Sequence, residues 1–336
     1  MKHYRNKDLC KINTFHLHTR AREYMIIDDI KDLATLDLNR KYFILGGGSN
    51  ILFVNDFDGL VIHNKINGIK VTKEVNNYIY LSINSGESWT KLVKFVTKNN
   101  WGGIENLAYI PGTVGGAPIQ NIGAYGVEIA ESVEYVKCFD LINRKFLVLT
   151  KDECNFGYRD SIFKKELKNK VFITEIGLKL TIKKHNYKLD YAGIKEEIER
   201  RKIQKISPEV IANIITYIRR KKLPNPNKIG NAGSFFKNPE IEKNLANKLL
   251  KEYPNMPTYP TNTESLVKIP AGWLIEQCGL KGYVHKGAAV HQNHALVLVN
   301  KNNATGRDIL ELANIIKKNV KNKFDIELEY EVNIII

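Results

Sequence analysis

The sequence predicts a mixed α and β protein of two or three domains, and three observations carry this prediction. With 336 residues, 43% of them hydrophobic and 26% charged, the chain is long enough to bury more than one core. Segments that alternate apolar and polar residues are interleaved with segments whose apolar residues recur at helical spacing. The proline-bearing stretch LPNPNKIGNAG, residues 223–233, is the best domain boundary.

The N-terminal block starts with a predicted helix at 28–37, followed by a short buried strand, YFIL at 42–45, that runs directly into GGGSN. A hairpin comes next, because 69–75 and 78–84 alternate around Asn76–Asn77, and asparagine tolerates the left-handed backbone of a tight turn. A helix follows, since apolar residues recur at i, i+3, i+4 and i+7 in one segment, 88–98.

The middle block is predicted to contain three strands and one long helix. The strands are VEYVKCF, KFLVLT and VFITEIGLKL, at 133–139, 145–150 and 171–180. The helix at 208–222 has Ser207 as its N-cap and Pro208 at its first position.

The last block alternates helices with strands. Helices are predicted near 240–252 and at 270–278, followed by the apolar strand ALVLVN at 295–300. A capping box, Thr305 with Asp308, starts a further helix whose apolar face includes Ile309, Leu312, Ile316 and Val320. The segment 324–334 alternates apolar and mostly acidic residues, which predicts a strand with two unlike faces.

The net charge is +15, from 51 basic and 36 acidic residues, yet the basic residues are scattered. RRKK at 219–222 is the only run of four. We therefore expect no nucleic-acid partner, and favour a basic cleft for an anionic small molecule.

Apolar runs are far shorter than the roughly 20 residues that a membrane span needs, and the first residues lack the apolar core of a secretory signal. We expect a cytoplasmic protein with no membrane partner. The four cysteines are far apart and form no C-x-x-C pair, so we expect free thiols and no metal.

Two glycine-rich loops are the strongest signal for a ligand. GGGSN at 46–50 follows a strand, and IPGTVGGAPIQNIGAYG at 110–126 has five glycines and no charge. Glycine permits the close approach that a nest of backbone N–H groups needs around a diphosphate. Taken alone, each loop is more typical of a structural turn than of a cofactor site, and the presence of two such loops favours the site. The G-x-G-x-x-G and G-x-x-x-x-G-K-[ST] motifs of commoner nucleotide folds are absent.

These loops belong to an ordered set of motifs. FGYRDSIFK at 156–164, KLPNP and GNAGSFFKNP within 222–239, and LEYEV at 328–332 follow them. In this order, from NTF at 13–15 to Glu331, the set resembles the UDP-N-acetylenolpyruvoylglucosamine reductase family. YKLDYAGI at 187–194 resembles the insertion of the longer family type, which carries a substrate-binding tyrosine loop.

The resemblance implies an α+β protein with a vanillyl-alcohol-oxidase/PCMH-like FAD-binding fold of two subdomains plus a C-terminal α+β substrate-binding domain. We expect subdomain 1 at 1–70, joined by the C-terminal strand 324–336. Subdomain 2 would comprise 71–222, with the tyrosine-loop insertion near 183–207, and the substrate domain 223–323.

The resemblance also implies an enzyme with non-covalent FAD and with NADPH as co-substrate, and we expect a monomer. It would reduce UDP-N-acetylglucosamine enolpyruvate to UDP-N-acetylmuramate for peptidoglycan synthesis. The alternative is a flavin-dependent oxidase of the same fold that uses oxygen. Such oxidases often attach the flavin to histidine or cysteine, and the glycine loops contain neither.

Three catalytic residues follow from the family motifs. Ser234 would donate a proton, Arg159 would hold the substrate carboxylate and stabilise enolate charge, and Glu331 would complete the site. From pattern alone, Ser234 is equally a structural serine and Arg159 a partner of Asp160. Glu327 and Glu329 share the strand face of Glu331, so only the resemblance selects it.

Binding roles are carried over in the same way. Tyr191 would contact the UDP-sugar and Lys222 a phosphate, although packing and a helix C-terminal charge explain them as well. The other expected substrate ligands are Asn238, Asn293 and His294. The expected FAD ligands are Gly46, Gly47, Gly48, Ser49, Asn50, Pro111, Gly112, Gly115, Gln120, Asn121, Gly123, Ala124, Tyr125 and Arg219.

Overall fold

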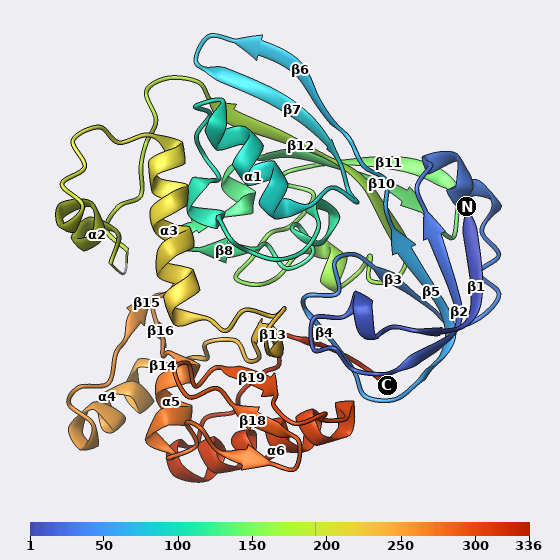
Figure 1. The fold of residues 1–336 in the computed structure, drawn as a ribbon. Helices are drawn as coiled ribbons and strands as arrows, with labels where there is room; N and C mark the ends of the chain where they lie inside the picture. The colour runs from blue at the N-terminus through green and yellow to red at the C-terminus, as the bar shows by residue number, and fades with distance from the viewer. Residues whose placement is uncertain (192) are drawn as a thin grey trace. The chain divides into compact units, whose positions relative to one another are not determined.

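The computed structural model describes residues 1–191 and 193–336 (Figure 1). The described chain divides into two compact units, each assembled from separate stretches of sequence. Unit 1 consists of Met1–Lys7, Ala21–Gly47 and Asp58–Lys221, and unit 2 of Asp8–Arg20, Gly48–Phe57 and Lys222–Ile336. The three-domain division stays a prediction. Residue 192, inside the predicted tyrosine-loop insertion, lies outside the described residues.

The first sheet of unit 1 has the strand order β1-β2-β5-β3. Strands β3 and β5 pair in parallel, in register from Tyr42–Leu60 to Leu45–His63. The GGGSN segment starts directly after the last residue of β3, Leu45. The strands are β1 (Lys2–Asp8), β2 (Arg20–Ile27), β3 (Tyr42–Leu45) and β5 (Phe57–Asn64).

The α-helix predicted at 28–37 is instead the short 3₁₀ helix η2, Ile30–Thr35. The side chain of Asp29 accepts a hydrogen bond from Lys31 N–H and starts it. Leu33 and Leu36 are buried, and their spacing of three residues suits the three-residue turn of a 3₁₀ helix.

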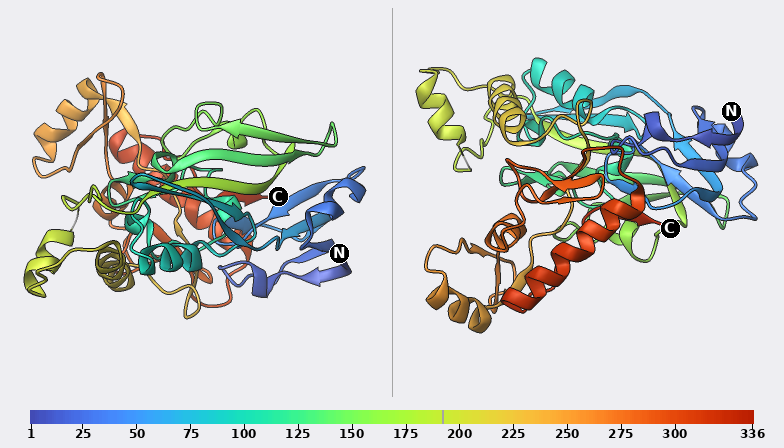
Figure 2. Two further views of the ribbon diagram at one scale, coloured as in Figure 1. Left: turned by 90° about the horizontal axis from the view of Figure 1, so that it is seen from above. Right: turned by 60° about the horizontal axis from the view of Figure 1, so that its bottom comes forward.

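The second sheet of unit 1 is antiparallel, in the order β11-β10-β12-β7-β6. Its predicted strands and the hairpin turn at Asn76, with φ of 56°, are confirmed. Figure 2 shows α1 and α3 on the same side of this sheet, where both contribute to one apolar core. The elements are β6 (Ile69–Val75), β7 (Tyr78–Asn84), β10 (Val133–Asp140), β11 (Lys145–Thr150), β12 (Val171–Thr181), α1 (Trp89–Lys98), α2 (Ile194–Arg200) and α3 (Pro208–Lys222).

Local caps explain where these helices start. Ser88 accepts from Lys91 N–H at the start of α1, and Ser207 accepts from Val210 N–H at the start of α3. Short segments complete the loops of the chain: η1 (Cys10–Ile12), η3 (Glu105–Leu107), η4 (Val114–Gly116), β8 (Gly123–Ala124), β9 (Val127–Glu128), η5 (Ile129–Glu131) and η6 (Ile162–Lys164).

Unit 2 contains a four-stranded sheet in the order β13-β19-β18-β17, and a three-stranded sheet in the order β14-β16-β15. The elements are β13 (Gly230–Ser234), β14 (Glu240–Glu242), α4 (Lys243–Glu252), β15 (Tyr259–Pro260), β16 (Leu266–Lys268), α5 (Ala271–Gln277), β17 (Val284–His285), β18 (Ala288–Val290), β19 (Val297–Asn300) and α6 (Gly306–Phe324).

Helix α6 lies along the four-stranded sheet (Figure 2, right). The predicted capping box is present, since Thr305 and Asp308 bond each other's backbone N–H. The four predicted inward residues are fully buried, which confirms the predicted face: Ile309, Leu312, Ile316 and Val320.

The strand predicted at 324–336 is largely wrong. Helix α6 continues through Phe324 and ends at Asp325, whose φ of 56° breaks the helix. Alternating burial persists beyond it, with Ile326, Leu328 and Val332 buried. However, only β20, Asn333–Ile335, forms a strand, pairing in parallel with β4 (Ile51–Phe53). Alternation reports which side chains are buried, while a strand also needs a continuous hydrogen-bonding partner.

Within the described residues, no helix combines the length and apolar character that crossing a bilayer requires.

Candidate active site

The first half of GGGSN packs against the second glycine loop inside unit 1. A Cβ atom added to Gly46 would lie 2.6 Å from Thr113 Oγ1, and one added to Gly47 would lie 2.7 Å from Gly112 Cα. Only glycine lets two backbones approach this closely. The two segments singled out in the sequence are therefore direct neighbours.

The second half of GGGSN belongs to unit 2. Gly48 has φ of +64°, and a side chain there would overlap the carbonyl of Ile12. Thr14 N–H donates to Gly48 O at 3.0 Å, so the NTF motif holds this half of the loop. The glycine at 48 is required both by its backbone conformation and by the contact.

Asn121 holds the second glycine loop from inside. It is 1% exposed, and its amide nitrogen donates to Glu128 Oε2 at 2.6 Å and to Gly157 O at 3.0 Å. Its amide oxygen accepts from Ala130 N–H at 3.1 Å. Because these partners occupy the side chain, the FAD contact predicted for Asn121 would come from its backbone. Gly157 belongs to the FGYRDS segment, which is thereby tied to the loop.

Arg159 lies in that segment and reaches the same glycine loop. Its Nη2 donates to Gly123 O at 2.7 Å, and a Cβ on Gly123 would lie 2.8 Å from Nη1. Gly123 therefore leaves the space that the guanidinium occupies. The guanidinium also lies over the ring of Tyr158, 5.4 Å from its centroid. The neighbouring acid Asp160 pairs with Lys165.

Arg219 brings a second guanidinium to this part of unit 1. Its Nε donates to Tyr109 O at 3.2 Å. Burial lowers the pKa of Arg219, Tyr125 and Tyr109 counteract this, and the positive charge of Arg159 lowers it further. An anion bound beside the two guanidinium groups would stabilise their charged forms, because its negative charge would offset both the loss of solvation and the repulsion between the two positive charges.

The tyrosine loop lies beside the second glycine loop. The rings of Tyr191 and Tyr125 meet edge to face, with centroids 5.9 Å apart, and Tyr191 is 48% exposed. Asn106 joins the two segments, because its amide nitrogen donates to Tyr125 O at 2.8 Å and to Lys188 O at 2.9 Å. The predicted substrate tyrosine is thus anchored next to predicted FAD ligands.

In unit 2, Ser234 ends strand β13 opposite Val297 of β19. The strand has a register irregularity between Asn231 and Ser234, and Gly233 has φ of +72°. Asn231 Oδ1 accepts from Gly233 N–H at 3.0 Å and fixes this bend. The GNAGS sequence therefore gives Ser234 a rigid backbone at the end of a sheet.

Glu331 is placed next to this bend by backbone hydrogen bonds. Its N–H donates to Phe235 O at 2.9 Å, on the residue after Ser234. Asn50 Nδ2 donates to Glu331 O at 3.2 Å, and Asn333 N–H donates to Asn50 O at 3.1 Å. One predicted FAD ligand, Asn50, and one predicted catalytic residue, Glu331, thus share a network that reaches the residue after Ser234.

The remaining predicted substrate residues lie in unit 2 and differ in how they are engaged. Asn238 Oδ1 accepts from Ala271 N–H at 2.9 Å and so caps α5. Lys222 is exposed at the end of α3. Asn293 and His294 form the turn between β18 and β19.

The remaining predicted FAD ligands belong to the two glycine segments. Gly115 N–H donates to Ser85 O at 2.8 Å, which fastens the second glycine loop to the end of β7. The others lie on the same two segments: Ser49, Pro111, Gln120 and Ala124.

His63 and Tyr24 are buried residues that the sequence patterns did not reveal. The Tyr24 hydroxyl hydrogen-bonds Nδ1 of His63, and the ring also bonds the backbone carbonyl of Gly46. Burial lowers the pKa of His63 to about 4, with the nearby Lys65 acting in the same direction. The imidazole is therefore neutral at pH 7 and holds the glycine loop. In the sequence, His63 is only one position of the apolar strand LVIHN.

The residues of unit 1 fit a flavin dinucleotide. Gly46, Gly47 and Gly112 form a side-chain-free backbone cradle of the kind a diphosphate requires. Arg159 and Arg219 add two partly buried cationic groups. This fold and site define an FAD-dependent oxidoreductase.

Comparisons with known proteins identify the family. A model described as "FAD binding domain" matches residues 29–143, and one described as "UDP-N-acetylenolpyruvoylglucosamine reductase, C-terminal domain" matches residues 225–335. The reductase of Flavobacterium johnsoniae is 41% identical over 98% of both chains, and that of Aliivibrio fischeri is 46% identical over 97% of this chain and 93% of its own. The chain belongs to the UDP-N-acetylenolpyruvoylglucosamine reductase family.

A solved structure agrees with this membership. The reductase from Thermus caldophilus superimposes with a TM-score of 0.66 at 25% sequence identity, and the match covers 99% of this chain and 98% of that one. Because these relatives are reductases, they confirm the predicted reductase and not the alternative, an oxidase.

Proposed function

We propose that Ser234, Arg159 and Glu331 perform the protein's part of the reduction of UDP-N-acetylglucosamine enolpyruvate to UDP-N-acetylmuramate, the reaction of this NADPH-dependent family. When bound, FAD supplies the hydride chemistry. The side chains must then meet two demands. One group stabilises negative charge at the carbon that carries the substrate carboxylate, and another gives that carbon a proton.

Ser234 is assigned as the proton donor. The bond from Glu331 N–H to Phe235 O carries this assignment, because it brings the Glu331 backbone to the rigid bend that presents Ser234. A serine hydroxyl is a weak acid and needs a neighbour that stabilises its conjugate base. Glu331, held from its other side by Asn50, is the residue that we assign to complete the proton-transfer site.

Arg159 is assigned to the substrate carboxylate and the enolate. A guanidinium is planar, remains charged, and can bind a carboxylate through two parallel hydrogen bonds. Gly123 and Tyr158 orient the group, so little conformational freedom remains to be lost on binding. Arg219 adds a second positive charge, which raises the local affinity for anions.

The glycine segments are assigned to the flavin, with Gly46, Gly47 and Gly112 as the backbone cradle. For the UDP-sugar we assign Tyr191, which Asn106 keeps beside the glycine loop through its bonds to Tyr125 and Lys188. Asn238 would offer its amide N–H groups, while its oxygen accepts the hydrogen bond that caps α5. Lys222, Asn293 and His294 complete the proposed substrate ligands.

Separate measurement of the two half-reactions tests the assignment. In Ser234→Ala, anaerobic bleaching of the flavin by NADPH should keep the wild-type rate. Reoxidation by the enolpyruvyl substrate should slow by about 10²–10⁴, the usual contribution of a positioned proton donor. Ser265→Ala, an exposed serine of the same unit, is the matched control.

Two results would count against the proposal. Wild-type reoxidation in Ser234→Ala would remove Ser234 from proton transfer. Reoxidation by oxygen alone, with no acceleration by the enolpyruvyl substrate, would favour an oxidase.

A further inference from the structure

Unit 2 contains a cavity of about 600 Å³ that none of the residues assigned above lines. Its walls come from four segments of unit 2: the N-terminal stretch around Cys10–Thr19, the turn after β4 at Val54–Asp56, the residues at the start of β13, and the residues at the start of α6. This volume is within the roughly 300–1,000 Å³ typical of small-molecule sites.

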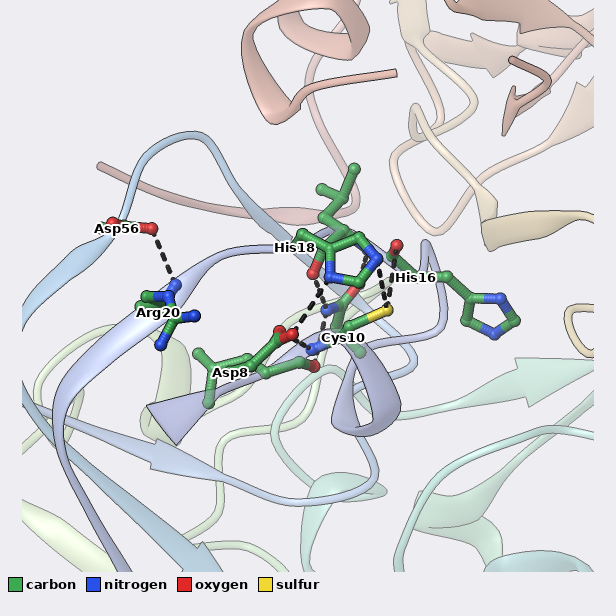
Figure 3. A network of polar contacts seen from close by, with 9 residues as sticks. Asp8, Cys10, His16, His18, Arg20 and Asp56 are labelled. Carbon is green, nitrogen blue, oxygen red and sulfur yellow. Dashed lines mark hydrogen bonds and ion pairs between the residues drawn. The ribbon is translucent and has the colours of Figure 1, made fainter. Parts of the chain in front are cut away.

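The charged groups that line the cavity are mainly cationic. Lys228, Lys301 and Arg307 line it, against one carboxylate, Asp56. Among the described residues, neither lysine ammonium group has a hydrogen-bond or ion-pair partner. Asp56 is already engaged, since its Oδ1 accepts from Arg20 N–H at 2.7 Å (Figure 3). The cavity therefore favours an anion.

The N-terminus of α6, a helix of 19 residues, also faces this cavity. The capping box satisfies the N–H groups of Thr305 and Asp308. The N–H groups of Gly306 and Arg307 have no partner within the described part of the chain. Gly306 is buried, and a side chain there would overlap the carbonyl of Phe53. Two free amides at a helix N-terminus are a recurrent binding element for phosphate.

Thr19 gives independent evidence for a ligand. The residue lines the cavity and is 6% exposed, and its hydroxyl has no hydrogen-bond partner among the described residues. A buried hydroxyl without a partner is unfavourable, and native proteins rarely keep one. A bound oxyanion would accept its hydrogen bond.

Figure 3 shows how the wall beside Thr19 is held. His18 Nδ1 bonds Asp8 Oδ2 at 3.0 Å, and its Nε2 lies 3.6 Å from Cys10 Sγ. Cys10 N–H also donates to Asp8, at 2.8 Å. The Asp8 carboxylate is therefore already hydrogen-bonded, to the His18 ring and to the Cys10 N–H.

We propose that this cavity binds a phosphate group, either free phosphate or the phosphate of a small monoester. The amides of Gly306 and Arg307 and the Thr19 hydroxyl donate hydrogen bonds to its oxygens. Lys228, Lys301 and the Arg307 guanidinium, whose Nε is held by Asn55 Oδ1 at 2.8 Å, balance its charge.

The test is a titration of the FAD-loaded protein, labelled with ¹⁵N, with inorganic phosphate at constant ionic strength maintained by sodium chloride. The amide signals of Gly306 and Arg307 should shift and saturate, while the flavin absorption spectrum stays unchanged. Phosphate that bound beside the flavin would alter that spectrum. A second titration with glycerol 3-phosphate distinguishes the sources, since tighter binding indicates a monoester and equal or weaker binding indicates free phosphate.

Variants locate the binding. The double variant Lys301→Gln/Arg307→Gln should weaken binding at least tenfold, whereas Lys318→Gln, an exposed lysine of the same helix, should leave it unchanged. Thr19→Val replaces an unpartnered hydroxyl with a methyl group, so it should fold normally yet bind phosphate several-fold more weakly than Thr19→Ser. Amide shifts that never saturate, or equal weakening in Lys318→Gln, would overturn the proposal.

Discussion

The amide nitrogen of Asn50 donates a hydrogen bond to the backbone carbonyl of Glu331, 281 positions later in the chain, at 3.2 Å. The same asparagine accepts backbone and side-chain hydrogen bonds from Asn333 through its own carbonyl, at 3.1 and 3.0 Å. A residue of the first glycine segment therefore supports the backbone of a proposed catalytic residue.

Removing this support should impair catalysis more than folding. Asn50→Ala deletes the bond to Glu331 but keeps the carbonyl that Asn333 uses. We expect the free energy of unfolding to fall by about 1 kcal/mol, the usual net value of one hydrogen bond. Turnover should fall about tenfold or more, because a displaced catalytic group loses its alignment. Steady-state kinetics and denaturant unfolding measure the two effects. Wild-type turnover in Asn50→Ala would show that Glu331 does not depend on this bond.

The contact between the glycine segments gives a second prediction. In Gly47→Ala, the new methyl group would lie 2.7 Å from Gly112 Cα, so the segments must separate. We expect a loss of stability of about 1–3 kcal/mol, typical of overpacking, and weaker FAD binding measured by flavin fluorescence.

Gly116→Ala is the matched control in the same loop, since its added atom would meet nothing closer than Thr113 Oγ1 at 3.9 Å. FAD binding that is equally weak in both variants would contradict the proposed cradle.

The buried His63 predicts a specific dependence of stability on pH. The unfolded chain protonates this residue below about pH 6.5, while the folded protein keeps it neutral down to about pH 4. Its contribution is therefore complete above pH 6.5. As the pH falls towards 4, it should be lost by on the order of 3 kcal/mol.

Guanidinium unfolding at several pH values between 7 and 4 measures this loss. The free energy of unfolding of His63→Gln should change less with pH over this range than that of the wild type. His16→Gln, an exposed histidine, should keep the wild-type dependence in phosphate-free buffer. Identical curves for wild type and His63→Gln would refute the assignment.

Asn106 provides the fourth prediction, which concerns the tyrosine loop. Asn106→Ala removes the bonds to Tyr125 O and Lys188 O. Tyr191 should then be less well positioned. Because positioning groups contribute mainly through orientation, the KM for the UDP-sugar should rise about tenfold. Reduction of the flavin by NADPH should be unaffected. Asn99→Ala, which removes an exposed bond to Phe95 O, is the control. An unchanged KM in Asn106→Ala would contradict the role in substrate binding that we assign to Tyr191.

Local interactions explain what could be predicted from the sequence. The starts of α3 and α6 were predictable because Ser207 and Thr305 bond backbone groups three residues away. Helix α1 was predictable from the spacing of its apolar residues, which are buried. The hairpin at Asn76 was predictable because its turn uses a residue that tolerates positive φ.

Long-range interactions explain the failures. The strand predicted from 324 could not be distinguished from an alternating segment without knowing that, of the described C-terminal residues 324–336, Asn333–Ile335 are the ones that pair with β4. Likewise, Glu331 shares its pattern with Glu327 and Glu329, and its own backbone partners, Phe235 and Asn50, are distant in the chain. His63 and Asn106 act through partners distant in the chain, so neither produces a motif.

The parallel pair of β4 and β20 sets an order of events during synthesis. Asn50 must wait for Asn333, 283 positions downstream, before its carbonyl can meet its final partner. At a translation rate of about 5–20 residues per second, this delay is on the order of tens of seconds. The nascent segment around β4 therefore leaves the ribosome as an unpaired edge, and a chaperone that shields it would act in this interval.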